Sequence, residues 1–326
     1  MIVPEFWAEA RRQVRHKRRS ITVRRFGWSD ESEAAAQAHA EARVQEALDA
    51  ILAGGQLRRR EQLSNYGIEG VPIREQIVSR HGDAVITRNS YGALCLNTPD
   101  VLFGDIDFES RPEGCVLPFA ANIAFWAAIT VVGGLQWNWL VGAILATAST
   151  WGLNALLLAR KRRAFADKGG AEARASARVQ AFSSTHPDWH LRVYRTPAGL
   201  RILAMHDTFS PRDEAVASFF NALHADALYS RMCKVQGCFR ARLTAKPWRV
   251  GMRRRIRPPV AAWSREQAQR PDRLAWIADY ERKAEGFAAC RYLHSLGDES
   301  RRHPRAEEVR ALHDALTRAD STLPLA

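Results

Sequence analysis

The sequence predicts an α+β fold interrupted by a hydrophobic helical hairpin, and three observations support this prediction. Short segments in which apolar and polar residues alternate, as in strands, occur on both sides of a long uncharged run. Segments with helical spacing of apolar residues separate these strands. The uncharged run itself, from Cys115 to Ala159, contains no Asp, Glu, Lys, Arg or His, although 25% of the chain is charged. We therefore expect one α+β domain into which a membrane hairpin is inserted.

The segment before the hairpin contains strand patterns and one long helix. Asp30 and Glu33 form a potential capping box for a helix that reaches about Leu52, and Gly54-Gly55 is a typical end signal. Alternating or apolar residues predict strands at about residues 21–24, 84–87 and 101–108.

Strand and helix patterns return after the hairpin. The turn Thr196-Pro-Ala-Gly199 predicts a β-hairpin, and Ser210 followed by Pro211 predicts the start of a helix. The expected elements are a helix at 171–182, strands at 190–195 and 200–205, a helix after 210 with a buried stripe of Val216, Phe219, Phe220 and Leu223, a strand at 238–243, and a mainly helical C-terminal region.

The uncharged run is long enough to cross a bilayer twice. Its two arms, about 116–132 and 139–159, meet at Gly133-Gly134-Leu-Gln136, and each approaches the roughly 20 residues that a spanning helix needs. Basic residues 160–163 follow the second arm, and the positive-inside rule then predicts that both termini lie in the cytoplasm at a bacterial-type cytoplasmic (inner) membrane. The predicted organisation is 1–114 and 161–260 as two parts of a cytoplasmic α+β domain, 115–160 as the transmembrane hairpin and 261–326 as a C-terminal helical region.

Composition restricts the function only broadly. The formal net charge of +13 favours polyanionic partners, such as nucleic acid, nucleotides or anionic lipid. Five cysteines without a framework spacing indicate a reducing compartment, and no secretory signal is expected. We find no P-loop, dinucleotide-binding fingerprint or Gly-x-Ser-x-Gly motif, so none of these enzyme classes has support in the sequence.

Two carboxylates follow an apolar strand. Asp105 and Asp107 are two residues apart, so both side chains should leave the same face of the strand. Two like charges on one face repel each other unless a cation joins them, and carboxylate oxygens suit Mg²⁺ or Mn²⁺. The sequence therefore predicts a metal site here, with a solvated acidic strand end as the alternative.

A basic region follows the strand at 238–243. No acidic residue occurs between Ala227 and Arg265, whereas Arg and Lys accumulate there. Arg240 and Arg242 alternate along the predicted strand and should point to one face, where a triphosphate or a nucleic-acid backbone is a natural partner. Anionic lipid is the alternative partner for this region.

Together these motifs resemble those of the archaeo-eukaryotic primase and primase-polymerase superfamily. The resemblance extends from Asp105 to Lys246 through short motifs: the strand-borne Asp-x-Asp, a Thr-x-x-Gly turn that opens a strand, and an Asp that precedes a Tyr and a basic strand. It implies an RRM-like mixed or antiparallel sheet with flanking helices. It also implies metal-dependent nucleotide binding or nucleotidyl transfer, with a nucleotide triphosphate and single-stranded nucleic acid as partners.

Site residues follow from the resemblance by position. Asp105, Asp107 and Asp226 would bind the catalytic Mg²⁺ or Mn²⁺, and the nucleotide would be held by Thr196, Gly199, Arg201, Arg240, Arg242 and Lys246. One position departs from the family pattern, because the middle motif usually ends in His and this chain has Arg201. His206 lies on the same predicted strand but should face the opposite side.

Other functions remain open at the sequence level. A glycosyltransferase could also end a strand in Asp-x-Asp and bind a nucleotide sugar, and a non-enzymatic membrane-anchored interaction module needs no metal. Cys233 and Cys238, with His224, are potential zinc ligands, although ordinary buried thiols explain them better.

Overall fold

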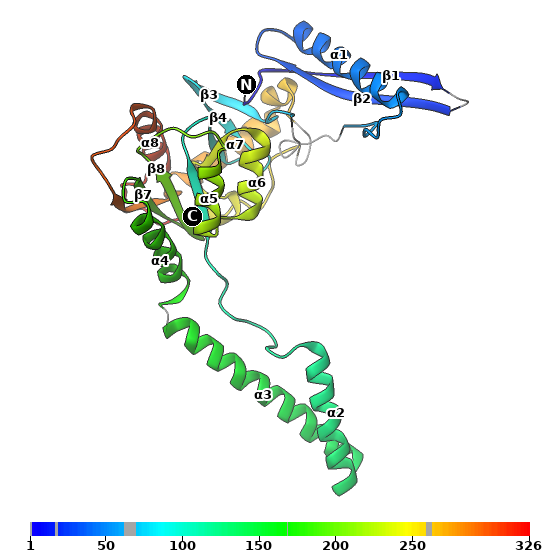
Figure 1. The fold of residues 1–326 in the computed structure, drawn as a ribbon, viewed down its shortest axis with the longest axis vertical. Helices are drawn as coiled ribbons and strands as arrows, with labels where there is room; N and C mark the ends of the chain where they lie inside the picture. Colours follow the sequence, from blue (N-terminus) through cyan, green and yellow to red (C-terminus); the bar gives the residue numbers. More distant parts are fainter. Residues whose placement is uncertain (1, 17–18, 62–69, 168, 259–262) are drawn as a thin grey trace. The chain divides into compact units, whose positions relative to one another are not determined.

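The computed structural model describes residues 2–16, 19–61, 70–167, 169–258 and 263–326 (Figure 1). The chain divides into two compact units, one of residues 1–106 and 182–326 and one of residues 107–181. Helices and antiparallel sheets confirm the predicted α+β class. The RRM-like arrangement stays a prediction.

A two-stranded ribbon backed by a helix forms the N-terminal module of the first unit (Figure 1). Strands β1 (Phe6–His16) and β2 (Arg19–Ser29) are antiparallel, and α1 (Glu33–Leu52) covers one of their faces. The contact is apolar, with Ala10, Ile21 and Val23 buried against residues of α1. The α1 N-cap is Ser32, whose Oγ accepts from the Ala35 amide at 3.1 Å, so the predicted Asp30 capping box is wrong.

Two four-stranded sheets follow. The first has the order β3-β4-β5-β9, and the second has the order β10-β7-β8-β6. Their bounds are β3 Gln76–His81, β4 Ala84–Arg88, β5 Leu94–Thr98, β6 Phe103–Asp107, β7 His190–Thr196, β8 Gly199–Ala204, β9 Phe239–Arg242 and β10 Arg291–Gly297. The predicted β7–β8 hairpin is confirmed, with Thr196 paired to Gly199 across its turn. Strands β3, β5 and β10 had no clear signal in the sequence.

Helices pack around these sheets. They are α5 Glu214–Leu223, α6 Ala227–Gln236, α7 Pro271–Ala284 and α8 Pro304–Thr317, with 3₁₀ turns η1 Pro247–Val250 and η2 Arg265–Gln269. Helix α4 (Gly170–Thr185) begins in the second unit and ends in the first. The predicted stripe of α5 is buried, although the helix begins after Asp213 and not at Pro211. Gly104 permits this packing on β6, because a Cβ there would come within 2.8 Å of the Phe219 ring.

The second unit contains the hydrophobic hairpin, α2 (Phe119–Gln136) and α3 (Trp139–Asp167). The turn lies at Trp137 and Asn138, so the division predicted at Gly133 is wrong. Gly133 remains helical because it faces Gly142, where a Cβ on Gly133 would come within 2.7 Å of the Gly142 Cα. Asn154 donates to the Asn122 Oδ1 at 2.6 Å and fixes the register of the two helices.

Both helices of the hairpin are long and apolar enough to cross a membrane. Only 6% of the apolar window of α2 and 17% of that of α3 are buried. Large apolar side chains such as Leu135, Leu140 and Trp151 are exposed. Core helices of a soluble protein would bury such residues, so the hairpin has the surface expected of helices that face lipid.

Candidate functional site

Asp105 lies on β6, the edge strand of its sheet, and its partner comes from the neighbouring strand β8. Arg201 donates from Nε to Asp105 Oδ1 at 2.8 Å and from Nη2 to Oδ2 at 3.1 Å. Its Nη1 donates to the Arg242 carbonyl oxygen at 2.8 Å and so connects the two four-stranded sheets. The Arg201 side chain is 2% exposed, whereas that of Asp105 is 33% exposed. The predicted phosphate-binding arginine is therefore an interior residue that neutralises the first predicted metal ligand.

The electrostatics agree with this pairing. Burial alone would lower the pKa of the Arg201 guanidinium, but the Asp105 charge and hydrogen bonds more than offset burial and raise the pKa above its ordinary value. Both Asp105 oxygens already accept hydrogen bonds from a cation, so the residues in this arrangement do not fit a divalent metal. The predicted Mg²⁺ or Mn²⁺ stays a prediction, and it would require Arg201 to release the carboxylate.

The other two predicted acidic ligands occupy different environments. Asp226 lies beside Asp105 in space, since the Asp226 amide donates to the Asp105 carbonyl oxygen at 3.1 Å. Its side chain caps α6 by accepting from the Leu228 amide at 2.9 Å. Asp107 is the exposed last residue of β6. Among the described residues, no group of three or more His, Cys, Asp or Glu side chains could hold a metal ion.

The predicted nucleotide-binding turn between β7 and β8 is occupied by the chain itself. Arg195 donates from Nη1 to the carbonyl oxygens of Thr196 and Gly199. Gly199 is buried and Thr196 is half-buried. The structure thus brings Thr196 and Gly199 together, but as parts of a self-contained turn.

The basic residues of β9 and the segment after it divide into interior and surface groups. Arg240 is 10% exposed and donates to Glu75 at 2.7 Å, and the Glu75 side chain is 1% exposed. Burial alone would lower the pKa of Arg240, but Cys95 and Glu75 raise it well above its ordinary value. Arg242 is half-buried. Lys246 lies over the Trp248 ring, 5.5 Å from its centroid, and Trp248 is 58% exposed.

Two clusters of titratable residues lie in the interior. Cys233 and Cys238 are buried free thiols, and burial raises the pKa of Cys238 to about 12. The sequence carried no signal for the second cluster, in which Cys290 Sγ lies 3.9 Å from His313 Nε2 and His313 Nδ1 lies 2.9 Å from Asp314 Oδ1. Cys290 and His313 are fully buried, so this Cys-His-Asp arrangement supports the structure and has no access for a substrate.

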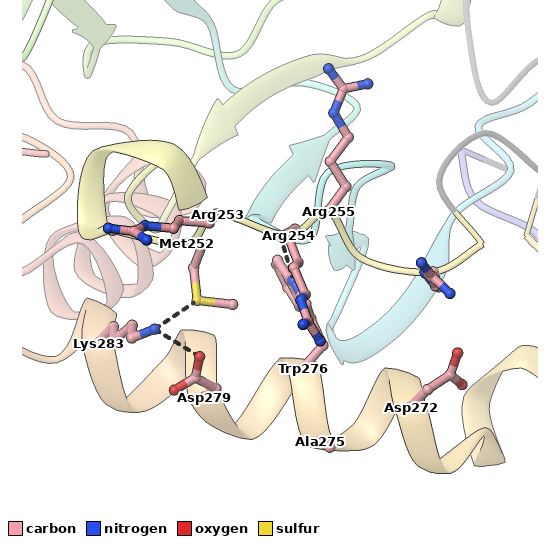
Figure 2. Close-up of a pocket in the computed structure, with 11 residues that line it drawn as sticks. Met252, Arg253, Arg254, Arg255, Asp272, Ala275, Trp276, Asp279 and Lys283 are labelled. Atoms are coloured by element: carbon pink, nitrogen blue, oxygen red, sulfur yellow. Dashed lines mark hydrogen bonds and ion pairs between the residues drawn. The ribbon is translucent and has the colours of Figure 1, made fainter.

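An open basic groove lies between the loop after η1 and helix α7 (Figure 2). Its volume is about 710 Å³. We call it the arginine groove and define it by its lining: Gly251, Met252, Arg253, Arg254, Arg255, Arg257, Asp272, Ala275, Trp276, Asp279 and Lys283. The loop contributes the four arginines, and α7 contributes the tryptophan and the two carboxylates.

The arginine groove has excess positive charge. Asp279 accepts from Lys283 at 2.8 Å, and Asp272 accepts from Arg270 at 3.0 Å, so both carboxylates are already paired. These hydrogen bonds hold the pKa of each acid below its usual value. In the described part of the chain, no carboxylate lies within ion-pair distance of Arg253, Arg254, Arg255 or Arg257, which are exposed.

Aromatic side chains lie in and beside the groove. Trp276 stacks on Tyr280, with centroids 5.3 Å apart, and its Nε1 donates to the Arg254 carbonyl at 2.8 Å. Gly92 faces the same indole, because a Cβ there would come within 2.4 Å of it. The next residue back along the chain, Tyr91, lies 5.4 Å from the exposed Trp248 ring. Of these rings, only that of Trp276 lines the groove beside the arginines.

Comparison of the chain with protein-family models, curated proteins and solved structures finds no match. The resemblance to primase-polymerases therefore stays a prediction from short motifs. The arginines of the groove were visible as part of the acid-free stretch after Ala227. Trp276 carried no such signal, because its approach to Arg254 depends on the packing of α7.

Proposed function

We propose that this chain is a membrane-anchored, non-enzymatic module that binds single-stranded nucleic acid through the arginine groove. The observation that carries the proposal is the set of four exposed groove arginines without a carboxylate partner among the described residues, next to Trp276. Guanidinium groups bind phosphate oxygens well, and an unpaired cluster of them has a strong attraction for a polyanion.

The aromatic residues favour a single strand over a free phosphate or a lipid headgroup. Unstacked bases can stack on indole rings, which contributes about 1–3 kcal/mol per base. Trp276 lies in the groove, and Trp248 is an exposed indole outside it. The four arginines lie within five residues of one loop, at positions 253, 254, 255 and 257. A repeating phosphate backbone matches such a row better than a single phosphate does.

The membrane anchor is the α2–α3 hairpin. The exposed apolar surfaces of both helices support membrane insertion, and the basic residues 160–163 at the end of the second span support a cytoplasmic location of the nucleic-acid-binding unit. In this proposal, the chain holds a nucleic acid at the inner face of a bacterial-type cytoplasmic membrane.

The test is binding of a labelled single-stranded oligonucleotide by the full-length protein in phosphatidylcholine nanodiscs, followed by fluorescence anisotropy over a salt series. The groove variant is Arg253→Gln/Arg254→Gln. Each phosphate contact with a single strand contributes about −0.7 to the slope of log K against log salt. The variant removes two such contacts, so its slope should be shallower by about 1.4. The matched control is Arg231→Gln/Arg302→Gln, which removes two exposed arginines outside the groove.

Two results would decide against the proposal. The first is equal affinity of the groove variant and the matched control. The second is absence of measurable binding by the wild-type protein at low salt. A Trp276→Leu variant separates stacking from charge, because it should weaken binding without changing the salt slope.

The metal-dependent nucleotidyltransferase predicted from the motifs is the second candidate. One observation favours it, namely the backbone hydrogen bond that makes Asp226 a neighbour of Asp105. The same nanodisc preparation can test it, by Mn²⁺- or Mg²⁺-dependent nucleotide incorporation on a single-stranded template with Asp105→Asn/Asp107→Asn as the control. The proposed non-enzymatic module predicts no incorporation in either protein.

A further inference from the structure

The β1–β2 ribbon has one face covered by α1 and one face that is polar and basic. Ala10 points toward α1, so the odd-numbered residues Arg11, Gln13 and Arg15 belong to the other, outer face. All three are exposed. Arg11 lies directly opposite Arg24 in the strand register. Like charges in opposite positions destabilise a ribbon, and the only carboxylate within ion-pair distance of this pair in the described chain is Glu9, 3.9 Å from Arg24.

Three more arginines line the edge of β2. The Arg24 amide donates to the Arg59 carbonyl at 2.9 Å, and the Glu61 amide donates to the Arg24 carbonyl at 3.2 Å. Residues 59–61 therefore pair with β2 through a parallel β-bridge between Arg24 and Arg60. Glu61 fixes the segment, since it accepts from Arg43 at 2.9 Å and from the Phe26 amide at 2.8 Å. Arg58, Arg59 and Arg60 are exposed beside β2.

The charges of this module are sorted by face. The solvent side of α1 carries the exposed acids Glu33, Glu41, Glu46 and Asp49, whereas the ribbon carries the arginines. Because the acids lie on α1 and the arginines lie on the ribbon, only the ribbon surface of this module is suited to a polyanion.

We propose that the outer face of the ribbon binds the backbone of duplex DNA, while the arginine groove holds a single strand; this inference rests on the proposed function. Arg11 and Arg15 are four residues apart on one face, a separation of about 13 Å. The major groove of B-DNA is about 12 Å wide. The two guanidinium groups can therefore contact phosphates on either side of that groove.

Two features favour DNA over a membrane surface or duplex RNA. Elements that lie on a membrane present apolar residues for insertion, whereas Arg11, Gln13, Arg15 and their neighbours across the ribbon, Ser20 and Thr22, are polar. The aromatic residues at the base of the ribbon are only partly exposed, and Arg74 covers Trp7 at 5.0 Å. In duplex RNA the major groove is deep and narrow, so the spacing of the arginines does not match it.

The experiment uses full-length protein in phosphatidylcholine nanodiscs, with a parallel set in phosphatidylglycerol nanodiscs. The four labelled probes are a single strand, a blunt DNA duplex, a DNA duplex with a single-stranded overhang and an RNA duplex. The ribbon variant is Arg11→Gln/Arg15→Gln, compared with the groove variant and the matched control defined above. We expect the duplex affinity of the ribbon variant to fall by about tenfold. Its slope of log K against log salt should be shallower by about 1.8, at about 0.9 for each of two phosphates. Its single-strand affinity should stay unchanged, and wild type should bind the overhang probe most tightly.

Several outcomes would overturn the inference. Duplex affinity of the ribbon variant equal to that of the matched control would do so. An equal loss of affinity for duplex RNA would reject the assignment to DNA. A ribbon variant that differs from wild type only in phosphatidylglycerol nanodiscs would assign the ribbon to lipid headgroups. By contrast, an unchanged single-strand affinity of the groove variant would refute the proposed function and leave the ribbon result intact.

Discussion

Replacing Arg201 by Met should destabilise the soluble unit strongly, because it removes one partner of an interior ion pair and keeps only an apolar stem. The change eliminates both hydrogen bonds to Asp105 and the one to the Arg242 carbonyl. Breaking a buried pair typically costs about 3–5 kcal/mol. Asp105 is one-third exposed, so water screens its unpaired charge and the lower end applies, with about 1 kcal/mol added for the Arg242 carbonyl. We expect a loss of about 3–4 kcal/mol in the free energy of unfolding.

Urea unfolding of the full-length protein in non-ionic detergent, followed by tryptophan fluorescence, measures this loss. A double-mutant cycle with Asp105→Asn isolates the pair, and its coupling energy should exceed about 1 kcal/mol. Arg302→Gln, an exposed control, should change stability by less than about 0.5 kcal/mol. A cost below 1 kcal/mol for Arg201→Met would refute the reasoning. So would a rise of the wild-type Tm with Mn²⁺ that Asp105→Asn abolishes, since the carboxylate would then be a metal ligand.

Three further predictions concern the interior and the hairpin. Glu75→Gln should cost about 3–5 kcal/mol in urea unfolding, because it leaves the buried Arg240 guanidinium without its carboxylate; an effect within the range of surface substitutions would contradict this. Asn154→Leu should weaken the α2–α3 contact by about 0.6–2 kcal/mol in detergent unfolding, with Thr150→Val on the same helix as a comparison. Burial alone would raise the pKa of Asp314, but His313 and Arg192 more than offset burial and lower it. The stability from Asp314 is therefore present above pH ~3.9 and lost as pH falls through the lower folded-state pKa, and Asp314→Asn should flatten the acid limb of a Tm–pH profile.

Local patterns predicted the elements whose signals lie within one segment. The Thr196–Gly199 turn, the stripe of α5 and the two apolar arms all depend on neighbours in sequence, and the structure confirms them. Strand β1 was missed because arginines occupy its outer face, so its apolar alternation is weak. Gly133 resembled a turn residue but is helical, since close approach to another glycine explains it equally well.

The site was harder to predict because its decisive contacts join residues far apart in the chain. Asp105 and Arg201 carry the same sequence signal whether they bind ligands or each other, and only the adjacency of β6 and β8 pairs them. The sequence likewise indicated a surface arginine at position 240, but in the structure Arg240 is an interior residue that pairs with the buried Glu75. The arginines of the groove were visible in the sequence, but the role of Trp276 required the position of α7.

The pairing of interior charges also decides where the net charge of +13 can act. Arg201 and Arg240 each have a carboxylate partner, so together with Asp105 and Glu75 they add nothing to the excess. Exposed arginines without a carboxylate partner, such as those of the arginine groove, contribute to the excess at the surface. Exposed charges are screened over about 8 Å at physiological ionic strength. Affinity for a polyanion should therefore fall steeply with salt, whereas the stability from the interior pairs should hardly change.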